Sequence, residues 1–281
     1  MTDLLHGIVD FSDYAELLPL LRTTIIACVA LGLVGGAVGV FVMMRDMAFA
    51  VHGISELSFA GASAGLLLGV GVVPGSLLGS MLAALVIGVL GSRARERNSA
   101  TAVLMPFGLG LGILCLSLYD GRASNKFGLL TGQIVAIDRT RIVSLLVICA
   151  VVLVGLAIVW RPLLFASTDP AVAAARGVPT RALSIVFMAL LGAAVAVSVQ
   201  VVGALLVLAL LVTPAASALR LSTSPLRVTA LSVLFALLAS VGGVLLAAGS
   251  SVPISPFVTT ISFAVYLVCR AVSAGRGAVA R

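Results

Sequence analysis

The stretch MAFAVHGISELSFAGASAGLLLGVGVV, Met47 to Val73, is long and apolar enough to cross a bilayer, yet it carries His52 and Glu56. Side chains four residues apart on an α-helix lie on one face about one turn apart, so these two can contact the same ligand. At a rise of about 1.5 Å per residue, Glu56 lies roughly 14 Å into a hydrocarbon core about 30 Å thick. An ionisable group at that depth is costly unless it faces a cavity, a partner or a cation, so the pair is predicted to be a functional site. The alternative is a His–Glu hydrogen bond that only fastens two helices.

The remaining sequence has the composition of a polytopic membrane protein. Hydrophobic residues make up 61% of the 281 residues and charged residues only 10%, whereas a soluble domain carries about 25% charged residues. The net charge of +7 comes mainly from basic residues in short gaps between apolar runs, so no nucleic-acid partner is expected. The sequence has no GxxxxGK[ST] nucleotide loop and no Ser/His/Asp or Cys/His arrangement, so neither enzymatic activity nor a cofactor is expected in this chain.

Apolar runs predict an all-α transmembrane bundle of about nine spans, forming one domain over residues 1–281. The runs are Thr23–Met44, Met47–Val73, Ser76–Leu90, Thr101–Leu118, Ile142–Trp160, Ala182–Val199, Val201–Leu219, Val228–Ala248 and Phe257–Val272. Residues 182–219 could instead form one long tilted helix, which gives eight spans. Nine spans, with the N-terminus outside and the C-terminus cytoplasmic, place twelve basic residues inside and five outside. Eight spans would place seven basic residues inside and ten outside. Nine spans therefore fit the positive-inside rule better.

Glycines in the opening stretch recur every four residues, at Gly61, Gly65 and Gly69. On an α-helix this spacing forms a face of small residues that lets another helix backbone approach closely. These glycines are therefore predicted to pack helices, including a second copy of the same stretch.

The segment LLFASTDPAVAAARGVPTRA, between the fifth and sixth runs, has the signals of a short helix. Its candidate N-caps are Ser167, Thr168 and Asp169. Pro170 fits the first helical turn, and Gly177 fits the position just after the helix end. The sequence thus predicts a cytoplasmic helix near 167–178, either a lever against a soluble partner or an ordinary surface helix.

The loop Tyr119–Arg141, on the predicted outer side, contains LLTGQIVAI, which is typical of a short interfacial or re-entrant segment. The residues assign it no role.

Three regions of the chain resemble signature regions of the permeases of bacterial metal-ion ABC importers, which take up zinc, manganese or iron. These regions are RDMAFAVHGISELSFAGASAG, FASTDPAVAAARGV and VVGALLVLALLVTPAASALRL, and they occur in the family's order. The resemblance implies a multi-pass permease in the bacterial plasma membrane. It also implies a cytoplasmic ATPase dimer that binds the ATP and an extracytoplasmic metal-binding protein. In this family the second region is similar to a coupling helix that seats in the ATPase, which implicates Asp169, Pro170, Ala174 and Gly177.

The chain departs from the family pattern in the first region. Such permeases usually have Asp and His four residues apart, whereas this sequence has His52 at the position of the Asp and Glu56 at the position of the His. One chain then supplies two ligands, too few for a tetrahedral or octahedral ion, but a two-fold dimer would supply two imidazoles and two carboxylates. Such a mixed set suits Zn²⁺, Mn²⁺ or Fe²⁺ without choosing among them. A homodimer is the simplest arrangement, and a pair of related chains is the alternative.

Two other functions are compatible with these residues. One is a permease for a metal chelate or a vitamin, in which the His–Glu pair is only structural. The other is a secondary transporter that uses no ATPase, in which Glu56 carries a proton and helix breaks near Gly203 and Pro214 build the ion site.

Overall fold

The computed structural model describes residues 21–90, 94–119, 139–248 and 253–279, and within these ranges every regular element is a helix. The elements are α3 (Arg22–Met44), α4 (Ala48–Leu67), α5 (Val72–Leu90), α6 (Ala94–Ser117), α8 (Arg139–Thr168), α9 (Pro170–Ala175), α10 (Thr180–Val202), the 3₁₀ turn η1 (Ala204–Leu206), α11 (Val207–Leu211), α12 (Thr213–Leu221), α13 (Pro225–Ala248) and α14 (Ile254–Val279). The predicted all-α transmembrane bundle is confirmed. Most of the loop Tyr119–Arg141, including LLTGQIVAI, lies outside the described residues.

Seven described helices are long and apolar enough to cross a membrane. They are α3, α5, α6, α8, α10, α13 and α14. The remaining two predicted runs correspond to α4 and to the α11–α12 segment. α4 has 20 residues but is more polar, because it carries His52, Glu56 and several serines. It also ends at Leu67 and not near Val73, since the chain turns and α5 begins at Val72.

The long-helix alternative over residues 182–219 is wrong, because α10 ends at Val202 and Gly203 has φ of 88° and ψ of 156°. The predicted span Val201–Leu219 is also not one helix. It is divided into η1, α11 and α12, with Pro214 in the first turn of α12. Broken backbone inside a membrane protein requires partners for the freed carbonyl groups. Ser255 and Ser262 of α14 supply two, donating hydrogen bonds of 2.9 Å to the Val202 carbonyl and 3.0 Å to the Ala209 carbonyl.

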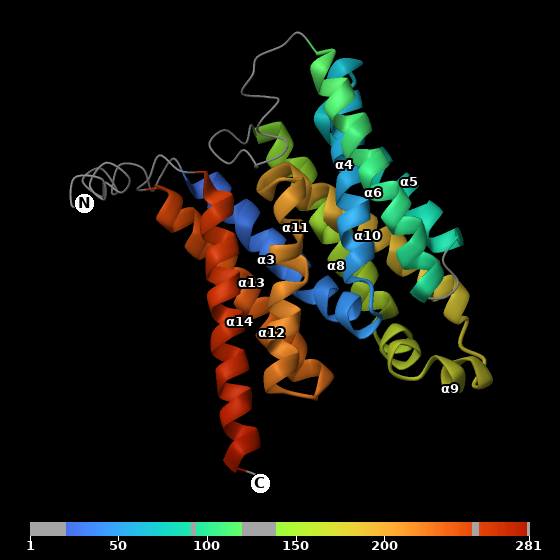
Figure 1. Ribbon diagram of the computed structural model, residues 1–281, viewed down its shortest axis with the longest axis vertical. Coiled ribbons are helices and arrows are strands. Elements are labelled where there is room, and N and C mark those ends of the chain that lie inside the picture. Colours follow the sequence, from blue (N-terminus) through green and yellow to red (C-terminus); the bar gives the residue numbers. More distant parts are fainter. Residues whose placement is uncertain (1–20, 91–93, 120–138, 249–252, 280–281) are drawn as a thin grey trace, which may run out of the picture.

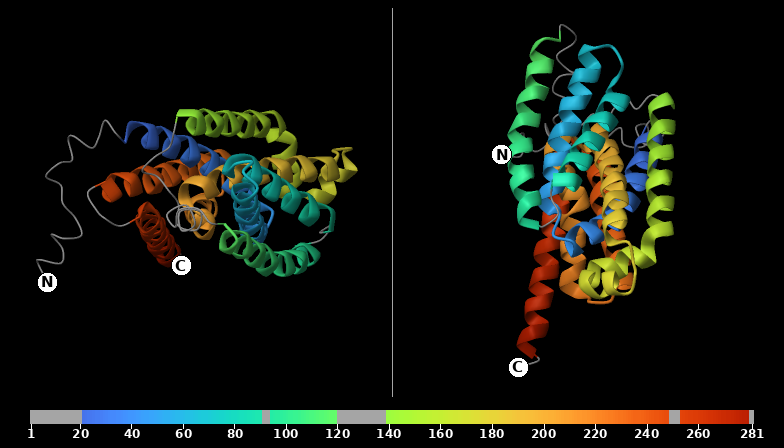
Figure 2. Two further views of the ribbon diagram at one scale, coloured as in Figure 1. Left: turned by 90° about the horizontal axis from the view of Figure 1, so that it is seen from above. Right: turned by 90° about the vertical axis from the view of Figure 1, so that its right-hand side faces the viewer.

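The centre of the bundle is formed by α3 and α10, which are mostly buried, while α6 and α8 expose most of their surface. Both views in Figure 2 place α6 and α8 on opposite faces of the molecule. An aromatic cluster joins the inner helices to α8. The Phe41 ring lies 4.9 Å from that of Trp160, nearly perpendicular to it, and 6.0 Å from that of Phe187.

Glycines bring α4 and α5 into backbone contact. A Cβ at Gly61 would meet the Gly75 carbonyl oxygen, and a Cβ at Gly65 would meet the Gly71 carbonyl oxygen. Gly69 differs, because it lies beyond the helix end with φ of 72° and no neighbouring atom within 4 Å of a Cβ built there. The predicted glycine face is therefore shorter than expected, and its first two members pack within one chain.

Replacing Gly61 with leucine should lower the stability of the fold, because the new side chain has to displace the α5 backbone. Overpacking of this kind costs about 1–3 kcal/mol. The measurement is the thermal unfolding midpoint of the detergent-solubilised protein. Gly110→Leu is the matched control, because no atom lies within 4 Å of a Cβ at Gly110. Equal losses in the two variants would contradict the assigned α4–α5 contact.

Candidate metal site on helix α4

His52 and Glu56 lie one turn apart on α4, with 3.8 Å between His52 Nε2 and Glu56 Oε1. The His52 side chain is 25% exposed and that of Glu56 only 3%. The separation is too long for a hydrogen bond. Both residues belong to the same helix, so their interaction with each other does not fasten two helices.

Each member of the pair has a buried polar atom without a partner. Among the described residues, neither His52 Nδ1 nor Glu56 Oε2 has a hydrogen-bond partner. A buried polar group left unsatisfied costs about 1–3 kcal/mol, and more if it is charged. Such an arrangement is costly in a purely structural pair and suits a site that receives a ligand.

The described part of the chain contains no group of three or more His, Cys, Asp or Glu residues that could hold a metal ion. The pair on α4 therefore supplies two metal-ligand atoms, one nitrogen and one oxygen, and no third His, Cys, Asp or Glu of the described residues joins them. A closed site with four ligands of these residue types does not occur within the described part of the chain.

Neighbouring helices hold the backbone of α4 firmly around the pair. α5 and α6 pack along it, and α10, η1 and α11 also contact it. A Cβ at Gly108 of α6 would lie 3.0 Å from the Leu57 nitrogen and 3.1 Å from the Glu56 carbonyl carbon. A larger residue at position 108 would therefore require α6 or α4 to shift, and glycine allows this close approach without a shift.

A chain of serine hydroxyls links α4 to two further helices. Ser58 Oγ lies 2.7 Å from Ser76 Oγ of α5, and Ser76 Oγ donates a 3.1 Å hydrogen bond to the Ala196 carbonyl of α10. Ser55 Oγ also donates to the His52 carbonyl at 2.8 Å. Sequence reasoning missed these serines and Gly108. The sequence did contain a signal for these contacts. Small and hydroxyl-bearing residues recur at helical spacing in these segments, which is typical of helix faces that pack against other helices.

Two carbonyl groups in and next to the broken segment after α10 already have hydrogen-bond partners. The Val202 and Ala209 carbonyl groups already accept hydrogen bonds from α14. An ion site of the broken-helix type requires such carbonyls to face the ion. These two hydrogen bonds satisfy part of the hydrogen-bonding capacity of the broken backbone without an ion.

The predicted ATPase-coupling residues lie in α9 and directly before and after it, at the lower end of the molecule in Figure 1. Asp169 is the N-cap, and its side chain accepts hydrogen bonds of 3.1 Å from the Ala171 nitrogen and 3.0 Å from the Val172 nitrogen. Ser167 and Thr168 bond instead to carbonyl groups within α8, at 2.6 and 2.9 Å. Asp169 is thus the one candidate among the three that caps the helix.

The end of α9 has the geometry of a glycine-terminated helix. Gly177 has φ of 79°, and its N–H donates a 3.0 Å hydrogen bond to the Ala174 carbonyl. Ala173 is buried and anchors the helix, whereas Val172 and Ala174 are exposed. α9 therefore presents a short, capped and largely uncharged surface.

The sequence profile of the ABC 3 transport family matches residues 18–273. The chain belongs to the ABC 3 transport family. This match, together with the relatives below, confirms the predicted family.

Curated relatives of this family member carry the names of metal transport proteins. It is 28% identical to the manganese transport system membrane protein MntC of Halalkalibacterium halodurans over 80% of this chain and 77% of that protein. It is 27% identical to the manganese import system permease protein ScaB of Streptococcus parasanguinis over 93% of each. It is 26% identical to the high-affinity zinc uptake system membrane protein ZnuB of Haemophilus influenzae over 88% of this chain and 93% of that protein.

Solved structures share the fold. PsaBC from Streptococcus pneumoniae, solved in complex with Fab, matches with a TM-score of 0.82 and 26% identity over 92% of this chain and 94% of that chain. An inward-facing putative metal-chelate type ABC transporter matches with a TM-score of 0.74. The identity is 16% over 93% of this chain and 91% of that chain, which supports a shared fold only.

Replacing Ser76 with alanine should weaken the attachment of α4 to α10, because it removes the hydroxyl that joins Ser58 to the Ala196 carbonyl. Loss of a buried hydrogen bond of this kind costs about 1–3 kcal/mol. The thermal unfolding midpoint in detergent measures the effect. Ser117→Ala is the control, because this exposed serine bonds only locally, to the Leu114 carbonyl. A Ser76 variant as stable as the control would show that the hydroxyl chain does not hold α4.

Proposed function

We propose that this chain is the membrane permease of an ATP-driven importer of divalent transition-metal ions, with Mn²⁺ or Zn²⁺ as the ion. The observation that carries the proposal is the His52–Glu56 pair, in which Glu56 is buried and the buried atoms His52 Nδ1 and Glu56 Oε2 have no partner among the described residues. The names of the relatives support manganese and zinc. Imidazole and carboxylate ligands also suit Fe²⁺.

Two copies of the pair form the proposed ion site. Because one chain supplies one imidazole and one carboxylate, a two-fold dimer of permeases supplies four ligands around a shared axis. Two carboxylates balance the charge of a divalent cation where the dielectric constant is low. A shared interface can also open to release the ion, as a transport site requires.

The exchanged order of the two ligands preserves the donor types of the family pattern. His52 supplies nitrogen where the family usually has an acidic residue, and Glu56 supplies oxygen one turn later. Glutamate is longer than aspartate by one methylene group. The site is therefore proposed to accept the same class of ion with a different position of the carboxylate.

The α9 helix is the proposed contact with a separate cytoplasmic ATPase, which binds the ATP. Its support is the exposed surface around Ala174 on a helix fixed at both ends by Asp169 and Gly177. The proposal therefore has the α9 end of the bundle and the C-terminus in the cytoplasm, with the N-terminus outside. An extracytoplasmic metal-binding protein completes the proposed importer.

Changing Glu56 to Gln and His52 to Ala tests the ion site, because the amide keeps the size of the carboxylate but not its charge. Each variant should abolish uptake of radioactive Mn²⁺ and Zn²⁺ by vesicles that contain the full complex, while assembly and ATP hydrolysis continue. His6→Ala, which alters the other histidine of the chain, is the control. Near-normal uptake by both variants would refute the site and leave a chelate or vitamin permease as the better interpretation.

Replacing Ala174 with glutamate tests the ATPase contact, because a large charged side chain on the exposed face of α9 blocks close packing. The variant should lose transport and dissociate from the ATPase or hydrolyse ATP without transport, and its thermal unfolding midpoint should not change. Ala174→Ser, which adds one oxygen atom, should retain coupled transport. Normal assembly and coupled transport by the glutamate variant would exclude α9 as the contact.

A further inference from the structure

A basic cavity lies beside α9, at the end of the bundle where α3, α5 and α8 finish and α6 and α10 begin. Its volume is about 680 Å³. Arg45, Arg97 and Arg181 line it, and Asp46 is the only acidic residue among its lining residues. Three guanidinium groups against one carboxylate give this cavity a net positive charge.

Two of these arginines have unused hydrogen-bond donors. Arg45 Nη1 and Arg97 Nε are buried, and neither has a hydrogen-bond partner among the described residues. Arg97 Nη2 donates a 3.1 Å bond to the Arg45 carbonyl, and the Arg45 guanidinium lies 5.5 Å from the centre of the Phe187 ring. Burial, and then the charge of Arg97, lower the pKa of Arg45. A bound anion would accept hydrogen bonds from the unpaired donors, and its charge would offset the repulsion between Arg45 and Arg97.

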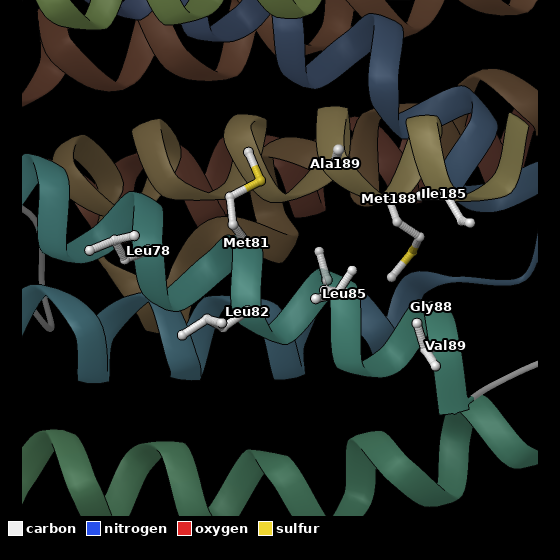
Figure 3. A pocket seen from close by; sticks show the side chains of 10 residues that line it. Leu78, Met81, Leu82, Leu85, Gly88, Val89, Ile185, Met188 and Ala189 are labelled. Atoms are coloured by element: carbon white, nitrogen blue, oxygen red, sulfur yellow. The ribbon is translucent and has the colours of Figure 1, made fainter. Parts of the chain in front are cut away.

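An apolar groove of about 270 Å³ begins where the basic cavity ends. Figure 3 shows its side chains, which come from α5 and α10. The groove and the basic cavity share Gly88, Val89 and Ile185 as lining residues, so the two adjoin each other. Along α5 the groove extends from Leu78 to Val89, which is about 16 Å at about 1.5 Å per residue. This length is close to half of a hydrocarbon core about 30 Å thick.

We propose that an anionic phospholipid occupies this combined site, with its phosphate at Arg45, Arg97 and Arg181 and an acyl chain in the groove between α5 and α10. Basic pockets between transmembrane helices bind lipid head groups of this kind. A free anion would use the cavity but not the groove, and an acidic segment of a partner protein would not follow a groove that runs toward the bilayer centre. Charge complementarity and the length of the groove together select a lipid.

The head-group contact is tested with Arg45→Gln and Arg181→Gln in the full chain, purified in detergent and titrated with phosphatidylglycerol or phosphatidylcholine in native mass spectrometry. Each variant should bind phosphatidylglycerol about tenfold more weakly, since it loses charge-assisted hydrogen bonds. Binding of phosphatidylcholine should change much less. Arg227→Gln is the matched control, because this exposed arginine lies outside both sets of lining residues. Equal phosphatidylglycerol affinity in all three variants would overturn the proposal.

The groove is tested with Gly88→Leu, which fills the junction of the two cavities. A Cβ at Gly88 would lie 3.5 Å from Met188 Cγ, an ordinary contact, so Gly88→Ala should fold normally and the larger side chain should occupy the passage. Gly88→Leu should reduce binding of long-chain phosphatidylglycerol and leave binding of glycerol phosphate unchanged. Gly88→Ala should reduce phosphatidylglycerol binding by a smaller amount. Glycerol phosphate that binds as tightly as phosphatidylglycerol would show an anion pocket without a lipid. Arginine variants that lose the ATPase but keep the lipid would assign the cavity to a protein partner.

Discussion

An imidazole and a carboxylate buried on one face of α4 set the main constraint on this fold. The Glu56 side chain is 3% exposed, and placing it against lipid would be costly. Protein must therefore enclose α4, and α5, α6 and α10 do so. Because α4 faces its neighbours and not the bilayer, it can have many serines and glycines. Its 20 residues are long enough to span the core, yet it is too polar to qualify as a span by composition.

The enclosure of α4 depends on close packing of its backbone against the neighbouring helices, because lipid gives no hydrophobic force that would drive helices together. Gly61 and Gly75 place α4 directly on α5, and Gly108 lets α6 reach the backbone at Glu56. Hydroxyl groups then satisfy polar atoms inside the contact, as Ser76 does by reaching the Ala196 carbonyl. Close packing and internal hydrogen bonds thus fix the position of the ionisable pair.

Local signals were sufficient where a feature depends on its own segment. The pairing of His52 with Glu56 follows from helical spacing, and the capping residues place α9 where the structure has it. Tertiary partners could not be read in this way. The spacing of Gly61 and Gly65 indicates a close contact but not whether α5 or a second copy supplies it, and Gly69 fails because the helix ends before it. Likewise Gly203 and Pro214 indicate breaks in the mostly apolar run that follows α10, but the hydrogen bonds from the distant helix α14 that satisfy its carbonyl groups cannot be read from this segment.

Metal movement and ATP hydrolysis are proposed to occur at separate places, and α10 is the element that joins them. It follows α9 after a short turn and continues, largely buried, for 23 residues, which is about 35 Å. It ends at Val202, and η1, which follows Gly203, contacts α4. Between its ends it accepts the hydrogen bond from Ser76, which also contacts Ser58, two residues beyond Glu56. The proposed route from α9 to the ligands therefore runs through α10, through its hydrogen bond from Ser76 of α5, and through the Ser58–Ser76 contact to α4.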